Sequence, residues 1–304
     1  MRRQFAQFAW TVLGFNLLVI LWGALVRASK SGEGCGDHWP LCNGTVIPHA
    51  AQIATLIEFT HRVTTGIAFL SVVFLAVWAF RSYRRELVWR AAAASLFFIV
   101  SEALLGAGLV LFKYVGADTS AGRTVYLSAH LINTLLLLAA MTLTAWWASG
   151  HAAMEWSGKN ATLLGGVIVT ALIIAVTGAI TALSDTLYPA ASLGAGLAAD
   201  LSTGSPVIVK LRMLHPLFAF VGGAWIVAIA ARIGRARRLA VSVMGLIALQ
   251  VVAGAINLYL LTPIWMQLIH LLLADLLWIA LVLFTAAVLE GSAAGKTVPE
   301  LIHR

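Results

Sequence analysis

Residues 55–80 read TLIEFTHRVTTGIAFLSVVFLAVWAF. This stretch exceeds the roughly 20 apolar residues that carry an α-helix across a hydrocarbon core, and its charged side chains stand near its start. It therefore predicts a membrane-spanning helix with a polar cluster towards one end. Comparable apolar stretches occur at 8–28, 91–112, 125–147, 161–183, 207–231, 239–261 and 264–288. The sequence thus predicts an all-α membrane protein with eight transmembrane helices.

The composition agrees with a membrane protein. Of the 304 residues, 61% are hydrophobic and 11% are charged, whereas a soluble domain has roughly 25% charged residues. The net charge is +8, but no basic surface interleaved with aromatic residues indicates nucleic-acid binding. We expect no nucleic-acid partner.

The basic residues predict the orientation in the membrane, because cytoplasmic loops carry an excess of Lys and Arg. Placing both termini in the cytoplasm puts thirteen basic residues inside and seven outside. We therefore expect a multi-pass protein of the cell (inner) membrane, and we expect the first span to be retained as a helix, not removed as a signal peptide. The thirteen are Arg2, Arg3, Arg81, Arg84, Arg85, Arg90, Lys159, Arg232, Arg235, Arg237, Arg238, Lys296 and Arg304.

The chain repeats itself in two halves, residues 1–150 and 151–304. Four landmarks recur in the same order, with offsets of 155, 154, 148 and 140 residues, and each half has four predicted spans, as in a parallel repeat. We predict two four-helix bundles related by a pseudo-twofold axis. The landmark pairs are Gly23 with Gly178, His61 with His215, Gly106 with Gly254, and His130 with His270.

The four histidines within the spans predict the chemistry. Polar side chains inside a membrane are costly and usually functional, and these four lie six to nine residues into helices that enter from outside, so they share one depth. Two imidazoles at one depth can bind a heme iron from opposite sides. Zinc is the competing interpretation, but two histidines per half supply few ligands for a tetrahedral site. We expect His61 and His130 to bind one heme, and His215 and His270 another.

The halves differ next to the first histidine of each pair. Glu58 precedes His61 by three positions, whereas Arg212 stands three positions before His215. Side chains three residues apart lie on neighbouring parts of one helix face, so Glu58 is a candidate for proton transfer beside a heme. The alternative is a salt bridge between Glu58 and Arg62 or an interaction at the helix start.

Other charged residues within the spans have less specific interpretations. Arg62 and Arg212 can pair with heme propionates if these point outwards, or can simply extend to the membrane interface. Glu102 and Asp275 are expected to make polar contacts between helices.

Two cysteines, Cys35 and Cys42, lie in the first external loop, where an oxidising compartment lets them pair. This loop reads GCGDHWPLCNG over residues 34–44, and EFTHR follows at 58–62. Together with eight spans and the later histidines, these elements resemble the heme A synthase family, in its bacterial type with one cysteine pair in the external loop. The resemblance covers essentially the whole chain.

The resemblance implies an oxidoreductase that converts a methyl group of heme O to the formyl group of heme A through hydroxylated intermediates, for terminal oxidase biogenesis. It implies that His61 and His130 bind the substrate heme, that His215 and His270 bind a heme b cofactor, and that Glu58 assists catalysis. Heme O synthase, a terminal oxidase subunit and an unidentified electron donor are the implied partners, and oligomers are compatible with it.

Residues 184–206 depart from family members that carry a second cysteine pair in the C-terminal half, because they contain no cysteine. A thiol relay through that half is therefore not expected. A disulfide between Cys35 and Cys42 would hold the loop over the N-terminal site, with a redox role in turnover as the alternative.

Two other functions fit part of the pattern. A diheme b-type electron-transfer protein also carries paired histidines on membrane helices, and a transporter of heme or a small molecule is often built from parallel repeats. The electron-transfer protein is the main alternative.

Overall fold

The computed structural model describes residues 2–49 and 52–291, and this part of the chain is almost entirely helical. Eight spans are long and apolar enough to cross a membrane, which confirms the predicted fold class. The basic residues Lys296 and Arg304 lie outside the described residues. The long helices are α1 (Arg2–Ala28), α2 (Ile53–Ser82), α3 (Leu87–Leu111), α4 (Ala121–Ala148), α5 (Gly158–Leu187), α8 (Leu214–Arg232), α9 (Arg237–Tyr259) and α10 (Ile264–Leu289).

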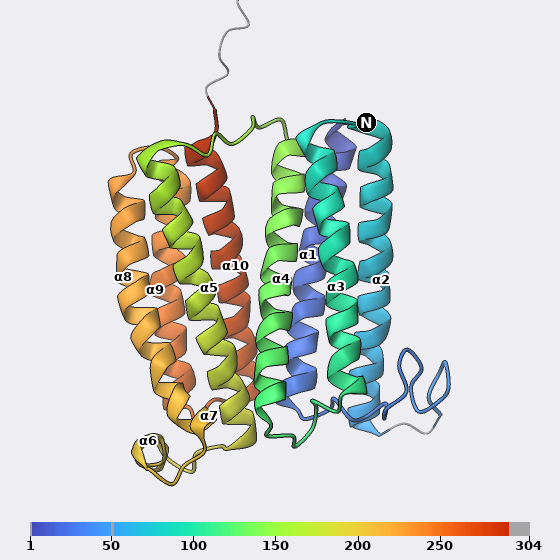
Figure 1. The fold of residues 1–304 in the computed structure, drawn as a ribbon, viewed down its shortest axis with the longest axis vertical. Helices are drawn as coiled ribbons and strands as arrows, with labels where there is room; N and C mark the ends of the chain where they lie inside the picture. The colour runs from blue at the N-terminus through green and yellow to red at the C-terminus, as the bar shows by residue number, and fades with distance from the viewer. Residues whose placement is uncertain (1, 50–51, 292–304) are drawn as a thin grey trace, which may run out of the picture.

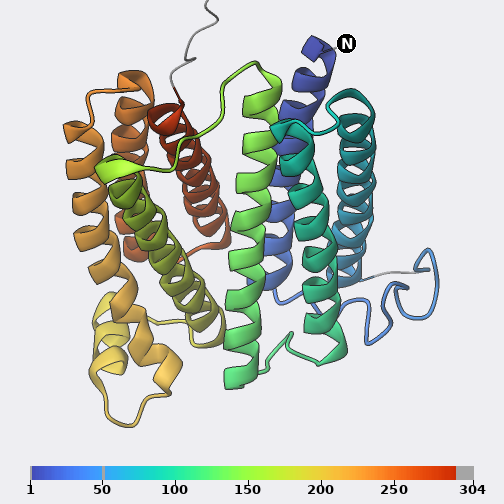
Figure 2. The same ribbon diagram turned by 45° about the horizontal axis from the view of Figure 1, so that its top comes forward.

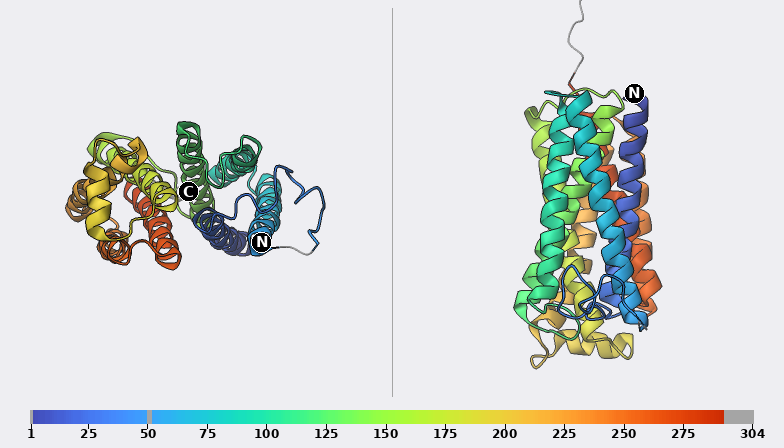
Figure 3. Two further views of the ribbon diagram at one scale, coloured as in Figure 1. Left: turned by 90° about the horizontal axis from the view of Figure 1, so that it is seen from below. Right: turned by 90° about the vertical axis from the view of Figure 1, so that its right-hand side faces the viewer.

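The long helices form two groups, α1 to α4 in one and α5, α8, α9 and α10 in the other (Figure 1). In the N-terminal half α1 packs on α2 and α4, and α3 packs on the same two helices; in the C-terminal half α5 and α9 each pack on α8 and α10. Seen from below, the two groups stand side by side, with α1 and α4 of one half against α5 and α10 of the other (Figure 3). Corresponding helices therefore form the contact between the halves.

The spans pack through part of their surface only. Large apolar side chains such as Leu70, Phe97 and Val125 are 66 to 70% exposed, although they belong to the middle or the start of long apolar helices. A helix can expose such a surface to lipid because its backbone hydrogen bonds are made internally. The exposed apolar side chains thus agree with a protein that lies in a bilayer.

One end of the molecule carries the longer connections, and we call it the loop end (Figures 1 and 2). It contains the segment between α1 and α2, the turn between α3 and α4, and the segment between α5 and α8 with the short helix α6 (Leu193–Leu201). The N-terminal end of α1 lies at the opposite end, where α10 also finishes. The chain thus enters and leaves the two bundles on the same side.

The sixth span, Val207–Arg232, is interrupted. A four-residue helix, α7 (Val207–Lys210), is followed by a 3-10 turn, η1 (Leu211–Met213), and then by α8. Pro216 explains this change, because proline has no N–H to donate to the carbonyl four residues earlier. The tighter 3-10 turn occupies that position. Arg212 lies in this turn, and His215 lies in the first turn of α8.

Two side chains bridge the halves. Arg27 of α1 donates hydrogen bonds to the carbonyl oxygen of Ala182 at 2.7 Å, to Thr186 at 2.8 Å and to Gln267 at 3.0 Å. Near the middle of the bundle, the buried indole of Trp278 donates to the carbonyl oxygen of Leu135 at 2.7 Å. The contact between the halves is therefore held by directed polar bonds as well as by apolar packing.

Candidate functional site

The four histidines lie at a common depth. They occur eight, nine, eight and six residues after the first residue of their spans, and all four spans start at the loop end. At about 1.5 Å per residue, this places each imidazole about 9 to 14 Å along its helix from the start of its span. The shared depth expected from the sequence is present.

Each histidine ring lies against a glycine of a neighbouring helix. A Cβ atom added to Gly23, Gly178 or Gly254 would come within 2.9 to 3.1 Å of the Cε1 atom of a histidine, which is closer than side chains normally pack. At Gly106 the same distance is 3.9 Å, an ordinary contact. The glycines are the repeat's other landmarks, and the pairs are Gly23–His61, Gly106–His130, Gly178–His215 and Gly254–His270.

The repeat therefore has a structural cause. In each half, the first and third helices supply a glycine where the second and fourth helices supply a ring. A glycine lets the two helix backbones approach with the imidazole between them. Helix packing and the placement of the imidazoles thus depend on the same residues.

The rings of His215 and His270 lie close together in the C-terminal half. The centroids of His215 and His270 are 6.3 Å apart, and the ring planes are nearly perpendicular, at 86°. Two metal–nitrogen bonds of about 2 Å, plus the distance from each nitrogen to its ring centre, match such a distance. The pair therefore fits an iron between the two rings.

The ring nitrogens in both halves are largely free to bind a metal. Nδ1 of His61 and Nδ1 of His270 are buried and have no hydrogen-bond partner, whereas Nδ1 of His130 lies 3.4 Å from Oε2 of Glu102, which leaves its Nε2 to bind iron. In His215, Nδ1 lies 3.2 Å from the carbonyl oxygen of Ile174, which leaves Nε2 to bind iron. Ligating histidines usually have their second nitrogen held in this way.

Within residues 2–49 and 52–291, no three His, Cys, Asp or Glu side chains come close enough together to hold a bare metal ion. Each half instead offers two imidazoles, which would suffice to hold a heme iron, since the porphyrin would supply the other ligands. The residues present therefore fit heme better than zinc.

Glu102 of α3 lies beside His130, a position that the sequence did not indicate. Its Oε2 atom lies 3.4 Å from Nδ1 of His130 and accepts a hydrogen bond from Asn133 at 2.6 Å, while Thr134 donates to Oε1. It makes the predicted contact between helices, but it also faces a candidate iron ligand. For Asp275 the expected polar contact is not found: the residue is buried, and within the described residues its side chain makes no hydrogen bond or ion pair.

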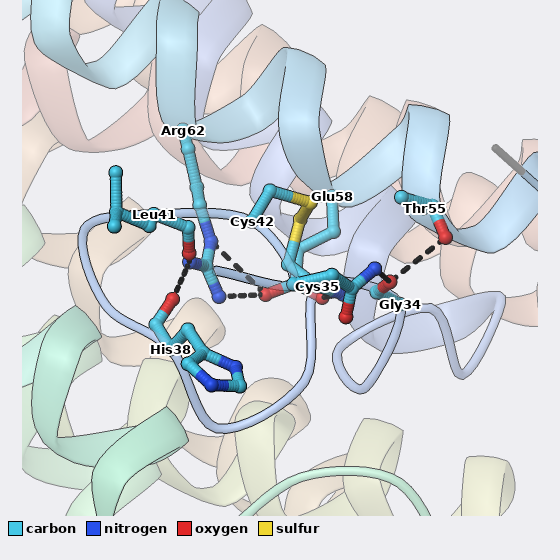
Figure 4. A network of polar contacts seen from close by, with 9 residues as sticks. Gly34, Cys35, His38, Leu41, Cys42, Thr55, Glu58 and Arg62 are labelled. Atoms are coloured by element: carbon cyan, nitrogen blue, oxygen red, sulfur yellow. Dashed lines mark hydrogen bonds and ion pairs between the residues drawn. A yellow bond between two sulfur atoms is a disulfide. The ribbon is translucent and has the colours of Figure 1, made fainter. Parts of the chain in front are cut away.

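The loop between α1 and α2 is held to α2 by Glu58 and Arg62 (Figure 4). Glu58 is 3% exposed and accepts a hydrogen bond from the backbone N–H of Cys35 at 2.8 Å. Arg62 pairs with Glu58 at 2.5 Å and donates to the carbonyl oxygens of His38 and Leu41, both at 2.6 Å. The salt bridge considered as an alternative from sequence is therefore present, and it fastens the loop to α2.

The disulfide expected in this loop joins Cys35 and Cys42. Gly34 precedes it, and a Cβ atom there would lie only 2.5 Å from the backbone of Ala54, so the loop touches the first turn of α2 directly. Thr55 adds a hydrogen bond to the carbonyl oxygen of Gly34 at 2.8 Å. The disulfide stabilises the loop, and these contacts fasten it to the start of α2.

A further contact of this loop reaches α3. Lys113 lies just beyond α3, and its Nζ atom is 2.9 Å from Oδ2 of Asp37. The hydrogen bond and the charge of Asp37 raise the pKa of Lys113. Both side chains are exposed, so this ion pair contributes little to stability.

Arg212 has the corresponding role in the C-terminal half. It is 8% exposed and bonds to Asp200 of α6 at 2.8 Å and to Asp185 at 3.1 Å. It also donates to the carbonyl oxygen of Tyr188 at 3.2 Å. Glu58 and Arg212 thus occupy matching positions, carry opposite charges, and each fasten the loop of their own half.

Arg62 and Arg212, the residues expected to meet heme propionates, are therefore engaged with protein partners. Their pairing with propionates stays a prediction. What the structure establishes is that both guanidinium groups lie at the loop end, one turn or less from a candidate ligand histidine in the sequence.

Comparison with known proteins places these features in a family. A protein of Thermus thermophilus named protoheme IX farnesyltransferase is 44% identical over 313 aligned residues, which cover 99% of this chain and 52% of that protein. The chain thus spans about half the length of this relative. Proteins named heme A synthase are 48% identical in Halalkalibacterium halodurans, over 32% of this chain and 33% of theirs, and 35% identical in Exiguobacterium, over 37% and 38%.

The family profile described as cytochrome oxidase assembly protein matches residues 6–282. This range includes all eight spans apart from a few residues at either end, and it contains Glu58, Arg212 and the four histidines. The chain belongs to the COX15-CtaA family of cytochrome oxidase assembly proteins.

Proposed function

We propose that this protein is a heme A synthase, which oxidises a methyl group of heme O to the formyl group of heme A. The observation that carries the proposal is the pair of histidines in each half, which lie at one depth and against glycines of neighbouring helices. The chain that carries them belongs to this family. The names of the partial relatives support the same reaction. The diheme electron carrier considered from sequence is not favoured by the family.

The reaction requires an oxidant. Written as a half-reaction, conversion of a methyl to a formyl group takes up one oxygen atom from water and releases four protons and four electrons, which an oxidant from outside the protein must accept. A hydroxymethyl group is the two-electron intermediate. Heme iron, when bound, supplies the redox chemistry, and the protein residues hold it, exclude water and provide groups for proton transfer.

We infer that the two halves divide this work. The N-terminal half, residues 1–150, takes heme O between His61 and His130, and the C-terminal half, residues 151–304, holds heme b between His215 and His270. The difference beside the first histidine supports this division, because a carboxylate lies there in one half and a guanidinium group in the other.

Glu58 is the proposed catalytic acid or base at the N-terminal site. It is a buried carboxylate, three residues from His61, and Arg62 compensates its charge. A carboxylate held in this way can receive a proton as the methyl group is oxidised. Its burial, at 3% exposed, keeps this carboxylate away from bulk water.

The proposed setting is the cell membrane, with both termini in the cytoplasm and the loop end outside. The substrate implies a preceding enzyme that transfers a farnesyl group to protoheme, and the name of the Thermus relative, about half of which this chain matches, supports such a neighbour. A terminal oxidase subunit and an electron-transfer protein complete the proposed partners.

The test is to express the protein in a host that makes heme O but not heme A, and to extract the hemes for chromatography and mass spectrometry. The wild type should yield heme A and a hydroxylated heme. Glu58→Gln should keep its bound heme and lose conversion by 100-fold or more, in the range of general acid–base catalysis. Glu33→Gln, an exposed acid in the same loop, is the matched control and should convert normally.

Three results would contradict the proposal in different ways. Protein without a Soret band would mean that the histidine pairs do not bind heme. Bound heme without heme A would favour the electron carrier. Normal conversion by Glu58→Gln would remove this carboxylate from the mechanism while leaving the reaction in place.

A further inference from the structure

Glu102 and Gln250 occupy equivalent positions in the two halves. The offset between them is 148 residues, the same as between Gly106 and Gly254, which lie on the same two helices. Each side chain faces the second histidine of its own half: Glu102 lies 3.4 Å from a ring nitrogen of His130, and Gln250 lies 3.3 Å from a ring nitrogen of His270. Both halves thus place a polar side chain beside the second histidine, at Nδ1 of His130 and at Nε2 of His270, but only Glu102 carries a charge.

We propose that Glu102 is a positioning residue that makes His130 a stronger electron donor to the N-terminal heme, whereas the neutral Gln250 leaves His270 an ordinary ligand to the C-terminal heme. This inference rests on the proposed function, because it requires heme in both halves. It adds an electronic difference between the two irons that the four ligand histidines by themselves do not provide.

The surroundings of Glu102 are built to hold a carboxylate that only accepts hydrogen bonds. Asn133 donates to Oε2 at 2.6 Å and Thr134 donates to Oε1. Asn133 is itself oriented by two further bonds, to the carbonyl oxygen of Phe98 at 2.9 Å and from Ser101 at 2.6 Å. Both oxygens are thus held by donors from α4, the helix that also carries His130.

The remaining contact of this carboxylate is with His130. Nδ1 of His130 is buried and has no hydrogen-bond partner, and Oε2 of Glu102 lies within ion-pair distance of it. When iron binds the other ring nitrogen, Nδ1 carries a hydrogen that this carboxylate can attract. Such a carboxylate beside a ligand histidine fixes the ring and increases the basicity of the ligand.

The C-terminal half lacks this charge. The amide nitrogen of Gln250 lies 3.3 Å from Nε2 of His270, and its carbonyl oxygen has no partner. An amide can orient the ring, but it adds no negative charge. A more basic axial ligand stabilises the oxidised iron, so Glu102 should lower the reduction potential of the N-terminal heme.

The experiment uses the full-length protein in detergent, loaded with ferric protoporphyrin IX and titrated by spectroelectrochemistry. Glu102→Gln should raise one of the two heme potentials by at least the equivalent of a tenfold change in equilibrium constant, about 59 mV for one electron. Glu102→Asp keeps the charge and should recover part of the shift. Gln250→Glu should lower the other potential and leave the first unchanged.

These variants distinguish an electronic role from a merely structural one. Loss of heme by Glu102→Gln with unchanged potentials in the remaining protein would overturn the inference, and so would a shift of the same heme by both Glu102→Gln and Gln250→Glu. If Glu102→Gln does not fold, Gln250→Glu still decides, since it adds the charge to the half that lacks it; an unchanged potential overturns the inference. Wild-type protein that binds no heme would overturn the proposed function instead.

Discussion

A glycine at each of four positions determines how close an imidazole ring can lie to the neighbouring helix. Three of these contacts are tight, and the fourth, between Gly106 and His130, has ordinary spacing. A single methyl group at a tight position must therefore displace the ring or separate the helices. Overpacking of this kind costs about 1 to 3 kcal/mol.

Gly178→Ala and Gly106→Ala form a matched pair that tests this at the residue scale. The added methyl of Gly178→Ala would lie 2.9 Å from the ring of His215, whereas that of Gly106→Ala would lie 3.9 Å from His130. We expect Gly178→Ala to lower the heme content of purified protein severalfold, measured by the Soret absorbance per polypeptide, and Gly106→Ala to change it little. Equal heme content in both variants would contradict the prediction.

The common depth of the four histidines could be predicted from the sequence, whereas the contact of Glu102 with His130 could not, for a physical reason. A histidine in an apolar span is costly wherever it points, so its presence alone indicates function. Whether Glu102 faces His130 depends on how α3 and α4 are rotated against each other, and spacing along one helix does not determine that rotation. The equivalence of Glu102 and Gln250 was the available signal, because it follows from the repeat.

At the scale of elements, each half uses one buried charge at the start of its second helix to hold a loop. Glu58 binds the backbone of Cys35, and Arg212 binds Asp200 and Asp185. The helix α6, which carries Asp200, was not predicted, since its nine residues are too short for a span and lie in a segment read as a connection. The interruption before α8 was indicated by Pro216.

Arg212→Met should destabilise the C-terminal half. It removes the cation between two carboxylates whose side chains are 16 and 17% exposed, and breaking a buried charge pair costs about 3 to 5 kcal/mol. We expect a lower midpoint of thermal unfolding in detergent, followed by circular dichroism. Lys210→Met is the control, because that lysine makes one exposed hydrogen bond, to Thr203. If Arg212→Met and Lys210→Met unfold at the same midpoint temperature, Arg212 does not support the loop.

At the scale of the whole molecule, the halves meet through corresponding helices, as they would in a symmetric dimer. Arg27 donates to the carbonyl oxygen of Ala182, which is its own counterpart in the repeat, 155 residues later, at the offset that also relates Gly23 to Gly178. This contact therefore lies close to the pseudo-twofold axis. One guanidinium group joins α1 to both α5 and α10.

Arg27→Met should weaken the association of the halves. Each hydrogen bond from a charged group contributes about 1.5 to 3 kcal/mol to the free energy of unfolding. The substitution removes the donor for three acceptors in the other half. Thermal unfolding should begin earlier and become broader as the halves separate before they unfold. Lys30→Met, at an exposed position just after α1, should leave the curve unchanged. A single sharp transition at the wild-type temperature would exclude this role for Arg27.

The close fit of three of the four imidazoles against a neighbouring helix changes how a common experiment should be read. Replacing a candidate ligand with alanine would delete a spacer together with the metal-binding atom, so the bundle could collapse locally even where no iron is bound. Glutamine or methionine would fill most of that volume. Comparing them with alanine would separate the work of coordination from the work of keeping two helices apart.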